Sequence, residues 1–217
     1  MSDFKQGEKN KIRRIPNRGH YDKETIYKIL DDGIICNISF IIDDQPFIIP
    51  TAYARVDDVL YVHGAKTSRM INQINRGLKI CFSVTHLDGY VLARSAFHHS
   101  MNYRSVVVFG TGKIVNERDE KILALKVFSE HLIPGRWEDV RKPNEKELNA
   151  TNVLKITIDE ASAKIRTGPA VDDKEDYDLD VWAGVLPFKI TKGELLKDEL
   201  LKPGVPVPDY LKEFTTN

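Results

Sequence analysis

Three apolar, β-rich runs follow one another within residues 34–63, joined by turns too short to hold a helix. The runs are IICNISFII (34–42), PFIIPTAYA (46–54) and VLYVH (59–63). Parallel neighbours would need a crossover of a dozen or more residues between successive runs. We therefore expect these runs to pair as an antiparallel β-meander.

The rest of the chain continues this pattern, with helical segments inserted at the junctions. Further strands are expected at 78–86, 90–97 after a turn at His86–Gly89, 103–115 and 152–166, with a last apolar segment at 181–190. Helices are expected at 22–33 with Asp22 as cap, after Ser68 with Met70, Ile71 and Ile74 inward, at 117–132 with Asn116 as cap, and after Asn144. Strands joined mostly by short turns predict a mainly β, antiparallel barrel with flanking helices.

Size and charge narrow the classes of function. A chain of 217 residues suits one substantial domain, and we expect a basic arm at 1–20, a domain at 21–190 and a tail at 191–217. Lysine plus arginine and aspartate plus glutamate both number 32, so no nucleic acid or membrane partner is expected. No run reaches the roughly 18 apolar residues of a membrane span. The N-terminus also lacks a secretory apolar stretch, so we expect a cytoplasmic protein.

The basic arm and the cysteines allow alternatives at this point. The arm could contact nucleic acid, but a solvated tail or an arm lying on a neighbouring subunit fits better, because the chain offers no matching basic surface. Cys36 and Cys81 lie in apolar runs, where a thiol usually behaves as a small hydrophobe. A disulfide or a cysteine metal site is therefore the less favoured interpretation.

The segment LYVHGAKTSRMINQINRG (60–77) places four anion-seeking groups where a strand gives way to a helix. Lys66 and Arg69 supply charge, and Thr67 and Ser68 supply hydroxyl donors. Helix starts carry unpaired N–H groups and partial positive charge, which favour a phosphate. The alternative is that Ser68 or Thr67 merely caps the helix while both cations face water.

The segment LARSAFHHSMNYRSVVVFG (92–110) is unusually polar for a stretch between apolar strands. Its adjacent histidines, His98 and His99, suggest a metal, but neighbouring strand residues point to opposite faces and no carboxylate lies nearby in the sequence. A hydrogen-bonding loop is favoured, and no metal site is predicted. The serines also lack the glycine-flanked turn of a hydrolase nucleophile. Anion-binding groups without an acid–base pair indicate a protein whose cofactor performs the chemistry.

These segments resemble a known family. Matching blocks are RGHYDKETIYKIL, QPFIIPTAYAR, LYVHGAKTSRM, THLDGYVLARSAFHHSMNYRSVVVFG, ASAKIRTGP and DVWAGVLPF, which run from about residue 18 to 188. The chain resembles the flavin-nucleotide-binding branch of the pyridoxamine 5'-phosphate oxidase-like superfamily, which also contains nitroimidazole-resistance proteins. The resemblance implies a Greek-key split barrel that forms a homodimer and binds two FMN molecules across its interface, with FAD or haem as alternative cofactors.

The resemblance also implies roles for sixteen residues. The FMN phosphate would meet Lys66, Thr67, Ser68 and Arg69, and the flavin ring would meet Ile49, Pro50, Thr51 and Ala52, with His63, Ser83, Thr85 and His86 lining the same cleft. Tyr103, Arg104, Ser105 and Trp182 would come from the opposing subunit, although Trp182 and Tyr103 could equally be interface core. Arg104 or His86 could stabilise negative charge near the ring.

The implied activity is electron transfer from NADH or NADPH through the flavin to a small acceptor, for which a nitroaromatic is one candidate. No catalytic residue is assigned. The Arg-x-His pattern of true pyridoxamine phosphate oxidases is missing after Trp182, and many nitroimidazole-resistance relatives have a histidine where this chain reads Cys36-Asn37-Ile38. The alternative function is a protein that stores or senses flavin, or haem, without turnover.

Overall fold

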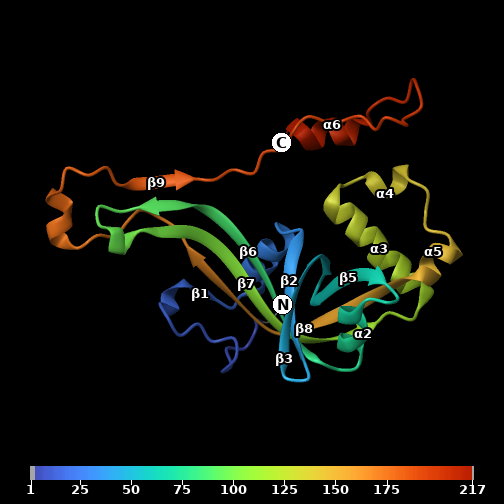
Figure 1. Ribbon diagram of the computed structural model, residues 1–217, viewed down its shortest axis with the longest axis horizontal. Helices are drawn as coiled ribbons and strands as arrows, with labels where there is room; N and C mark the ends of the chain where they lie inside the picture. Colours follow the sequence, from blue (N-terminus) through green and yellow to red (C-terminus); the bar gives the residue numbers. More distant parts are fainter. Residues whose placement is uncertain (1–2, 217) are drawn as a thin grey trace.

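The computed structural model describes residues 3–216 and shows a nine-stranded sheet with flanking helices (Figure 1). The strands in this part of the chain are β1 (Gly19–His20), β2 (Ile35–Ile42), β3 (Gln45–Ala52), β4 (Ala54–Val56), β5 (Val59–Ala65), β6 (Lys79–Leu92), β7 (Ser100–Ile114), β8 (Thr151–Arg166) and β9 (Gly184–Pro187). The α-helices are α1 (Lys23–Asp31), α2 (Arg69–Asn75), α3 (Arg118–Leu132), α4 (Arg136–Asp139), α5 (Glu145–Ala150) and α6 (Asp209–Thr216). Single 3-10 turns occur at η1 (Pro16–Arg18), η2 (Ala96–His98) and η3 (Lys174–Asp178).

All strand pairs are antiparallel, in the order β3-β2-β6-β7-β8-β5-β4, with β1 added to β8 and β9 added to β6. The chain passes from β3 into β4 through Tyr53 alone, so the two ends of the strand order are joined by the backbone. Only β2 pairs with β3, and β4 pairs with β5 only over Val59–Tyr61. The predicted antiparallel barrel is therefore confirmed, and it is split between the free edges of β3 and β5.

The core lies inside this barrel. Residues of alternate positions on β2, β6, β7 and β8 fill it together with the apolar side of α1, and its largest fully buried members are Tyr53, Phe40, Phe82, Ile26, Ile29, Leu30, Ile38, Leu60, Ile71, Ile74, Leu154 and Ile156. Helix α1 begins as predicted, with the Asp22 carboxylate accepting a hydrogen bond from Thr25 N. The Tyr53 hydroxyl donates to Leu30 O, which fixes the end of α1 against the turn from β3 to β4.

Helix α3 packs against β4 and β5 on the side that faces away from the barrel core. A second, smaller apolar cluster of Tyr61, Val115, Ala124 and Val153 fills the space between this helix and the sheet. The predicted cap Asn116 is wrong by one residue, because Glu117 precedes the helix and makes no side-chain capping bond. The helix predicted after Asn144 is confirmed, with a reciprocal capping bond between Asn144 and Glu147.

The hairpin of β6 and β7 is much longer than predicted and extends away from the barrel (Figure 1). The predicted turn at His86–Gly89 is wrong, because β6 continues through it to Leu92 with a bulge between Leu87 and Gly89. Strand β9 approaches so closely there that a Cβ at Gly89 would lie 2.6 Å from Leu186 O. The strand predicted at 90–97 is correspondingly replaced by the end of β6 and the turn η2.

Both ends of the chain lie against the domain. In the basic arm, Asn10 donates a side-chain hydrogen bond to Ala161 O of β8, and Lys9 pairs with Glu160 at 2.8 Å. At the other end, the Tyr210 hydroxyl of α6 donates to Asp139 and accepts from Arg136 of α4. The basic arm, expected to be a solvated tail or to lie on a neighbouring subunit, thus contacts β8 of its own chain.

Two further observations concern the cysteines and the length of the helices. Cys36 and Cys81 are free thiols, and burial raises the pKa of Cys36 to about 12, which keeps it protonated. Within residues 3–216, no helix combines the length and apolar character needed to cross a membrane.

Candidate functional site

The strand-to-helix junction after β5 carries exposed cations that no carboxylate neutralises. Ser68 caps α2, since its hydroxyl accepts a hydrogen bond from Ile71 N at 3.4 Å. The side chains of Lys66 and Arg69 form no ion pair with any residue of the described chain. The capping interpretation is therefore correct for Ser68, while Lys66 and Arg69 keep their charge available for a ligand.

A third cation, Lys121 of α3, joins this junction. Its ammonium group donates to Leu148 O at the end of α5. Burial lowers the pKa of Lys121, and the neighbouring charge of Lys66 lowers it further. Lys66, Arg69 and Lys121 together form what we call the cationic junction. Sequence reasoning missed Lys121 because only the packing of α3 brings it next to Lys66.

The free edge of β3 leads away from the cationic junction. The Arg69 guanidinium lies over the ring of Phe47, 4.4 Å from its centroid, and so joins α2 to β3. The predicted ring-binding segment Ile49–Ala52 follows on the same strand, whose outer edge has no strand partner in the described chain. Unpaired N–H and C=O groups on such an edge are available to a ligand.

His63 takes a position different from the other predicted site residues. Its ring lies edge-on against Phe128 of α3, with 4.4 Å between the centroids, and it is half-buried there. Burial lowers the pKa of His63, so the neutral form is favoured. The structure therefore places His63 under α3 rather than beside the β3 edge.

A second group of predicted residues lies on the outer face of the sheet, opposite the core. Ser83 is paired with Val107, and Thr85 with Ser105, and the partners of each pair share one face. The central positions of this outer face on β2, β6 and β7 are Ile35, Asn37, Ser39, Cys81, Ser83, Thr85, Leu87, Tyr103, Ser105, Val107 and Phe109. None of these central positions is charged, although 29% of the whole chain is, and the charged residues Lys79 and Lys113 lie at one end of the same face.

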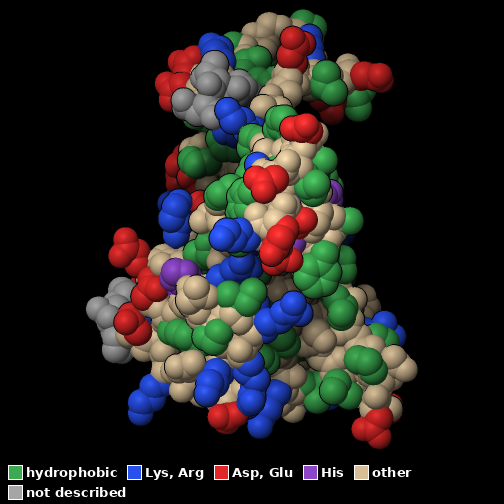
Figure 2. Space-filling view, turned by 90° about the vertical axis from the view of Figure 1, so that its left-hand side faces the viewer, with side chains coloured by type: hydrophobic (Ala, Val, Ile, Leu, Met, Phe, Trp, Pro, Cys, Tyr) green, Lys and Arg blue, Asp and Glu red, His purple; other side chains and the backbone are tan. Residues whose placement is uncertain are grey.

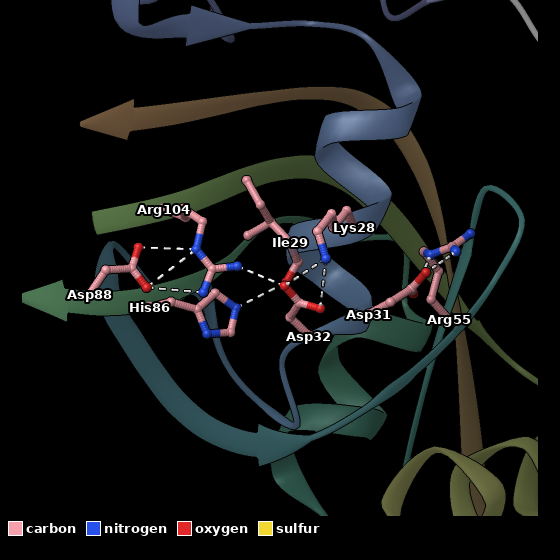
Figure 3. A network of polar contacts seen from close by, with 8 residues as sticks. All are labelled: Lys28, Ile29, Asp31, Asp32, Arg55, His86, Asp88 and Arg104. Carbon is pink, nitrogen blue, oxygen red and sulfur yellow. Dashed lines mark hydrogen bonds and ion pairs between the residues drawn. The ribbon is translucent and has the colours of Figure 1, made fainter. Parts of the chain in front are cut away.

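His86 and Arg104 point to the opposite side, toward the end of α1 (Figure 3). His86 Nε2 lies 3.0 Å from Ile29 O. The Arg104 guanidinium binds both oxygens of Asp88 at 3.0 Å and Asp32 at 2.7 Å. The hydrogen bond with Asp88 is the main cause of the raised pKa of Arg104, and that with Asp32 adds to it. Both side chains are thus held by partners within the same chain.

The tip of the long hairpin is joined to the segment that follows β8. Asp172, buried there, accepts hydrogen bonds from Arg94 N at 3.0 Å and from the Arg94 guanidinium at 3.1 Å. His98 Nε2 lies 3.3 Å from an oxygen of Asp173, and Asp176 offers a further carboxylate within 4.8 Å. The expectation that no carboxylate lies near these histidines is therefore wrong. It failed because residues 75 positions apart in the sequence meet at this tip.

Trp182 lies between η3 and β9, beyond the hairpin tip. Its side chain is 69% exposed, and its ring covers Gly184 so closely that a Cβ there would lie 2.8 Å from it. No core contact holds Trp182, which leaves its ring accessible to a partner or a ligand. The structure therefore groups the phosphate and ring residues at the β3 edge and separates them, within one chain, from His63, His86, Arg104 and Trp182.

The chemistry available at the cationic junction is recognition of an anion rather than acid–base catalysis. It offers three cations, the hydroxyl of Thr67 and a free strand edge, and no carboxylate or histidine side chain lies among its members. A phosphate with an attached planar group fits this arrangement, because cations bind the phosphate and backbone groups bind a polar ring edge.

The chain is similar to a known protein family and to several solved structures. Residues 22–165 match the sequence model of a family described as pyridoxamine 5'-phosphate oxidase. Among solved structures, the chain is similar to the flavocytochrome Anf3 from Azotobacter vinelandii, with 35% identity, a TM-score of 0.90, and coverage of 95% of this chain and 96% of that one. It is also similar to the FAD and haem binding protein from Mycobacterium smegmatis, with 32% identity, a TM-score of 0.87, and coverage of 91% and 97%.

A more distant similarity supports the fold alone. A 5-nitroimidazole antibiotic resistance protein from Bacteroides thetaiotaomicron has 20% identity, a TM-score of 0.58, and coverage of 68% of this chain and 86% of that one. No match was found among curated protein sequences. The resemblance inferred from the sequence blocks is confirmed by the family model and by these structures.

Proposed function

The chain belongs to the pyridoxamine 5'-phosphate oxidase family, and on that premise we propose that it binds a flavin nucleotide and transfers electrons through it. The donor is a reduced nicotinamide, NADH or NADPH, and the acceptor is a small molecule such as a nitroaromatic. FMN is the cofactor that the family resemblance implies, and FAD, together with haem, is named for the Mycobacterium smegmatis relative.

The observation that carries this proposal is the uncompensated charge of the cationic junction. Lys66 and Lys121 lie close enough for one to lower the pKa of the other, and like charges held together without a counter-ion are unfavourable. A phosphate removes this repulsion, and Arg69 can bind two of its oxygens at once. These residues therefore fit the phosphate end of a flavin nucleotide.

The remaining residues of the site bind and orient the ring. The outer edge of Ile49–Ala52 offers backbone donors and acceptors to the pyrimidine edge of the flavin, and Pro50 and Thr51 lie beside it. Bound there, the flavin supplies the capacity to take up two electrons and pass them on. Neither Arg104 nor His86 is included in this site, because His86 contacts Ile29 of α1 and Arg104 is bound by Asp32 and Asp88.

We further propose that the protein is a homodimer whose outer faces meet. Ile35 is 65% exposed and Ile48 of β3 is 67% exposed, on a face whose central positions on β2, β6 and β7 carry no charge. The centre of a protein–protein interface has fewer charged residues and more apolar area than the rest of the protein surface. In such a dimer Ser83, Thr85, Tyr103 and Ser105 would lie near the partner, which agrees with the roles implied by the resemblance.

Two measurements test the proposal. The absorption spectrum of the purified protein should show oxidised flavin, and chromatography of the released cofactor separates FMN from FAD. Anaerobic addition of NADH or NADPH should then bleach the flavin band. A spectrum without flavin, in protein that also fails to take up added FMN or FAD, would contradict the binding proposal. Bound flavin that stays oxidised for hours would leave a storage or sensing protein instead.

The names of the two similar structures favour haem as a second cofactor of this chain. The hairpin exposes groups of the kinds that hold haem, the imidazole of His99 at its tip and the thioether of Met101 in β7, and Phe97 of the tip is 90% exposed. With haem bound there, electrons could pass between flavin and haem, and the protein would need no binding site for a small-molecule acceptor. Titration of hemin should give a Soret band in the wild-type protein and a weakened band in His99→Ala. The control is His20→Ala, which changes a partly exposed histidine far from the tip in sequence and should leave the band equal to that of the wild type.

A further inference from the structure

Arg166, the last residue of β8, is a buried cation without an anionic partner. Its side chain is 6% exposed. Its Nη1 and Nη2 atoms donate to Asn102 Oδ1, Gly168 O and Pro169 O, which are all neutral acceptors. Burying a charge is costly unless an opposite charge compensates it. The hydrogen bonds therefore fix the guanidinium in place while its charge remains uncompensated.

Two more cations surround Arg166. Lys164 precedes it by two residues on the same face of β8, and Arg18 directly precedes Gly19, which is paired with Lys164. Burial lowers the pKa of Arg166, and the nearby charge of Arg18 lowers it further. Within the described chain, none of these three side chains forms an ion pair with a carboxylate. We call Arg18, Lys164 and Arg166 the β8-end cluster.

Hydroxyl groups complete the surroundings of this cluster. Tyr103 is paired with Arg166, and Ser105 with Lys164, so both hydroxyls come from the same outer face. The Tyr103 hydroxyl makes no hydrogen bond within residues 3–216, whereas Ser105 donates to Lys164 O. Figure 2 views the side on which β1 and the N-terminal arm lie, and Lys and Arg side chains gather on the lower part of that side.

We propose that the β8-end cluster is a second anion-binding site, which takes a phosphate or carboxylate group. Lys164, Arg18 and the remaining Nε of Arg166 supply charge, and the Tyr103 hydroxyl supplies a neutral donor. Arg166 is held in position by its three neutral acceptors. Its side chain therefore loses little conformational entropy when the anion binds.

This site is distinct from the cationic junction. The junction adjoins Thr151, where β8 starts, because Ala65 is paired with that residue. Arg166 ends the same 16-residue strand, which at about 3.3 Å per residue has a contour length of roughly 50 Å. The β8-end cluster and the junction therefore lie at opposite ends of the same strand. The anion is either a free molecule or part of a nucleotide held by a second copy.

The test measures anion binding in the Arg69→Gln background, which weakens the cationic junction and so makes the result independent of the proposed flavin site. Inorganic pyrophosphate and succinate are titrated separately by calorimetry at constant ionic strength. At least one of them should bind saturably. The added pair Arg18→Gln and Lys164→Gln should raise its Kd at least tenfold. The added pair Lys113→Gln and Lys146→Gln, two exposed lysines without partners, removes equal charge and should change the Kd less than twofold.

A second measurement distinguishes the source of the anion. Flavin affinity is compared between Arg18→Gln/Lys164→Gln and the lysine control pair, with Arg69 intact. Loss of free-anion binding alone assigns the site to a free phosphate or carboxylate, according to the probe that binds. A tenfold weaker flavin affinity without free-anion binding assigns it to a nucleotide on a second copy. If the charge-matched pairs behave alike in both measurements, the β8-end cluster is not an anion site.

Discussion

The Arg69 guanidinium lies over the Phe47 ring, and this contact joins the short helix α2 to the edge strand β3. It places one cation of the cationic junction at the start of the free strand edge. A phosphate bound by Arg69 would therefore have its attached group directed along Ile49–Ala52. The contact links the two halves of the proposed flavin site.

Replacing Arg69 by glutamine should raise the Kd for flavin at least tenfold. The change removes a charge-assisted bond to phosphate worth about 1.5–3 kcal/mol, and each 1.4 kcal/mol is about a factor of ten. Quenching of flavin fluorescence on titration measures the affinity. Arg76→Gln, at the other end of α2, serves as the matched control and should bind flavin as the wild type does. Equal affinities of both variants would place the phosphate elsewhere.

Replacing Arg104 by glutamine should reduce stability and leave flavin affinity within twofold of wild type. The guanidinium of Arg104, which is 30% exposed, connects β7 to Asp88 and to Asp32 at the end of α1. Loss of these partly buried contacts should lower the free energy of unfolding by about 1–2 kcal/mol. Urea denaturation gives that value. A large loss of flavin affinity in a stable variant would instead support the role implied by the resemblance.

The stability of the protein should fall as the pH drops below about 6.5, and His63 should contribute to that fall. Burial lowers the folded-state pKa of His63, so the unfolded state binds more protons between that pKa and the ordinary value of about 6.5. Stability then rises with pH across this window and levels off above it. His63→Phe should show a smaller loss of urea midpoint between pH 7 and pH 5, whereas His20→Gln should match wild type.

Introducing a charge at Ile35 should break the proposed homodimer. Ile35→Glu places a carboxylate in the centre of the outer face, where its burial against a second copy would be costly. Light scattering during size exclusion should give about twice 24.8 kDa for wild type and a monomer for the variant. Leu123→Glu changes an exposed apolar residue of α3 and should remain dimeric. A monomeric wild type would contradict the interface.

Local signals account for the parts of the fold that the sequence predicted well. Asp22, Ser68 and Asn144 act through neighbours three residues away, and the β2–β3 hairpin closes at Asp43-Asp44. Each of these features is decided within a few residues, so propensity and capping rules suffice.

Long-range packing decides the parts that were missed. Gly89 looked like a turn residue, but β9 arrives from almost a hundred residues later and keeps β6 extended through a bulge. Lys121 joins the cationic junction only because α3 crosses β4 and β5. Likewise, the acids that hold Arg104 and His98 come from α1, the bulge and η3, which no spacing rule brings together.

Strand β8 carries one proposed anion site near each end and is locked to β7 from Leu154 to Arg166. Sliding it by one residue would turn every inward side chain outward, so the strand behaves as a fixed spacer between the two sites. An anion bound at one end is therefore not expected to shift the other end by sliding of β8, and the spacing of the two charges is set by the register with β7.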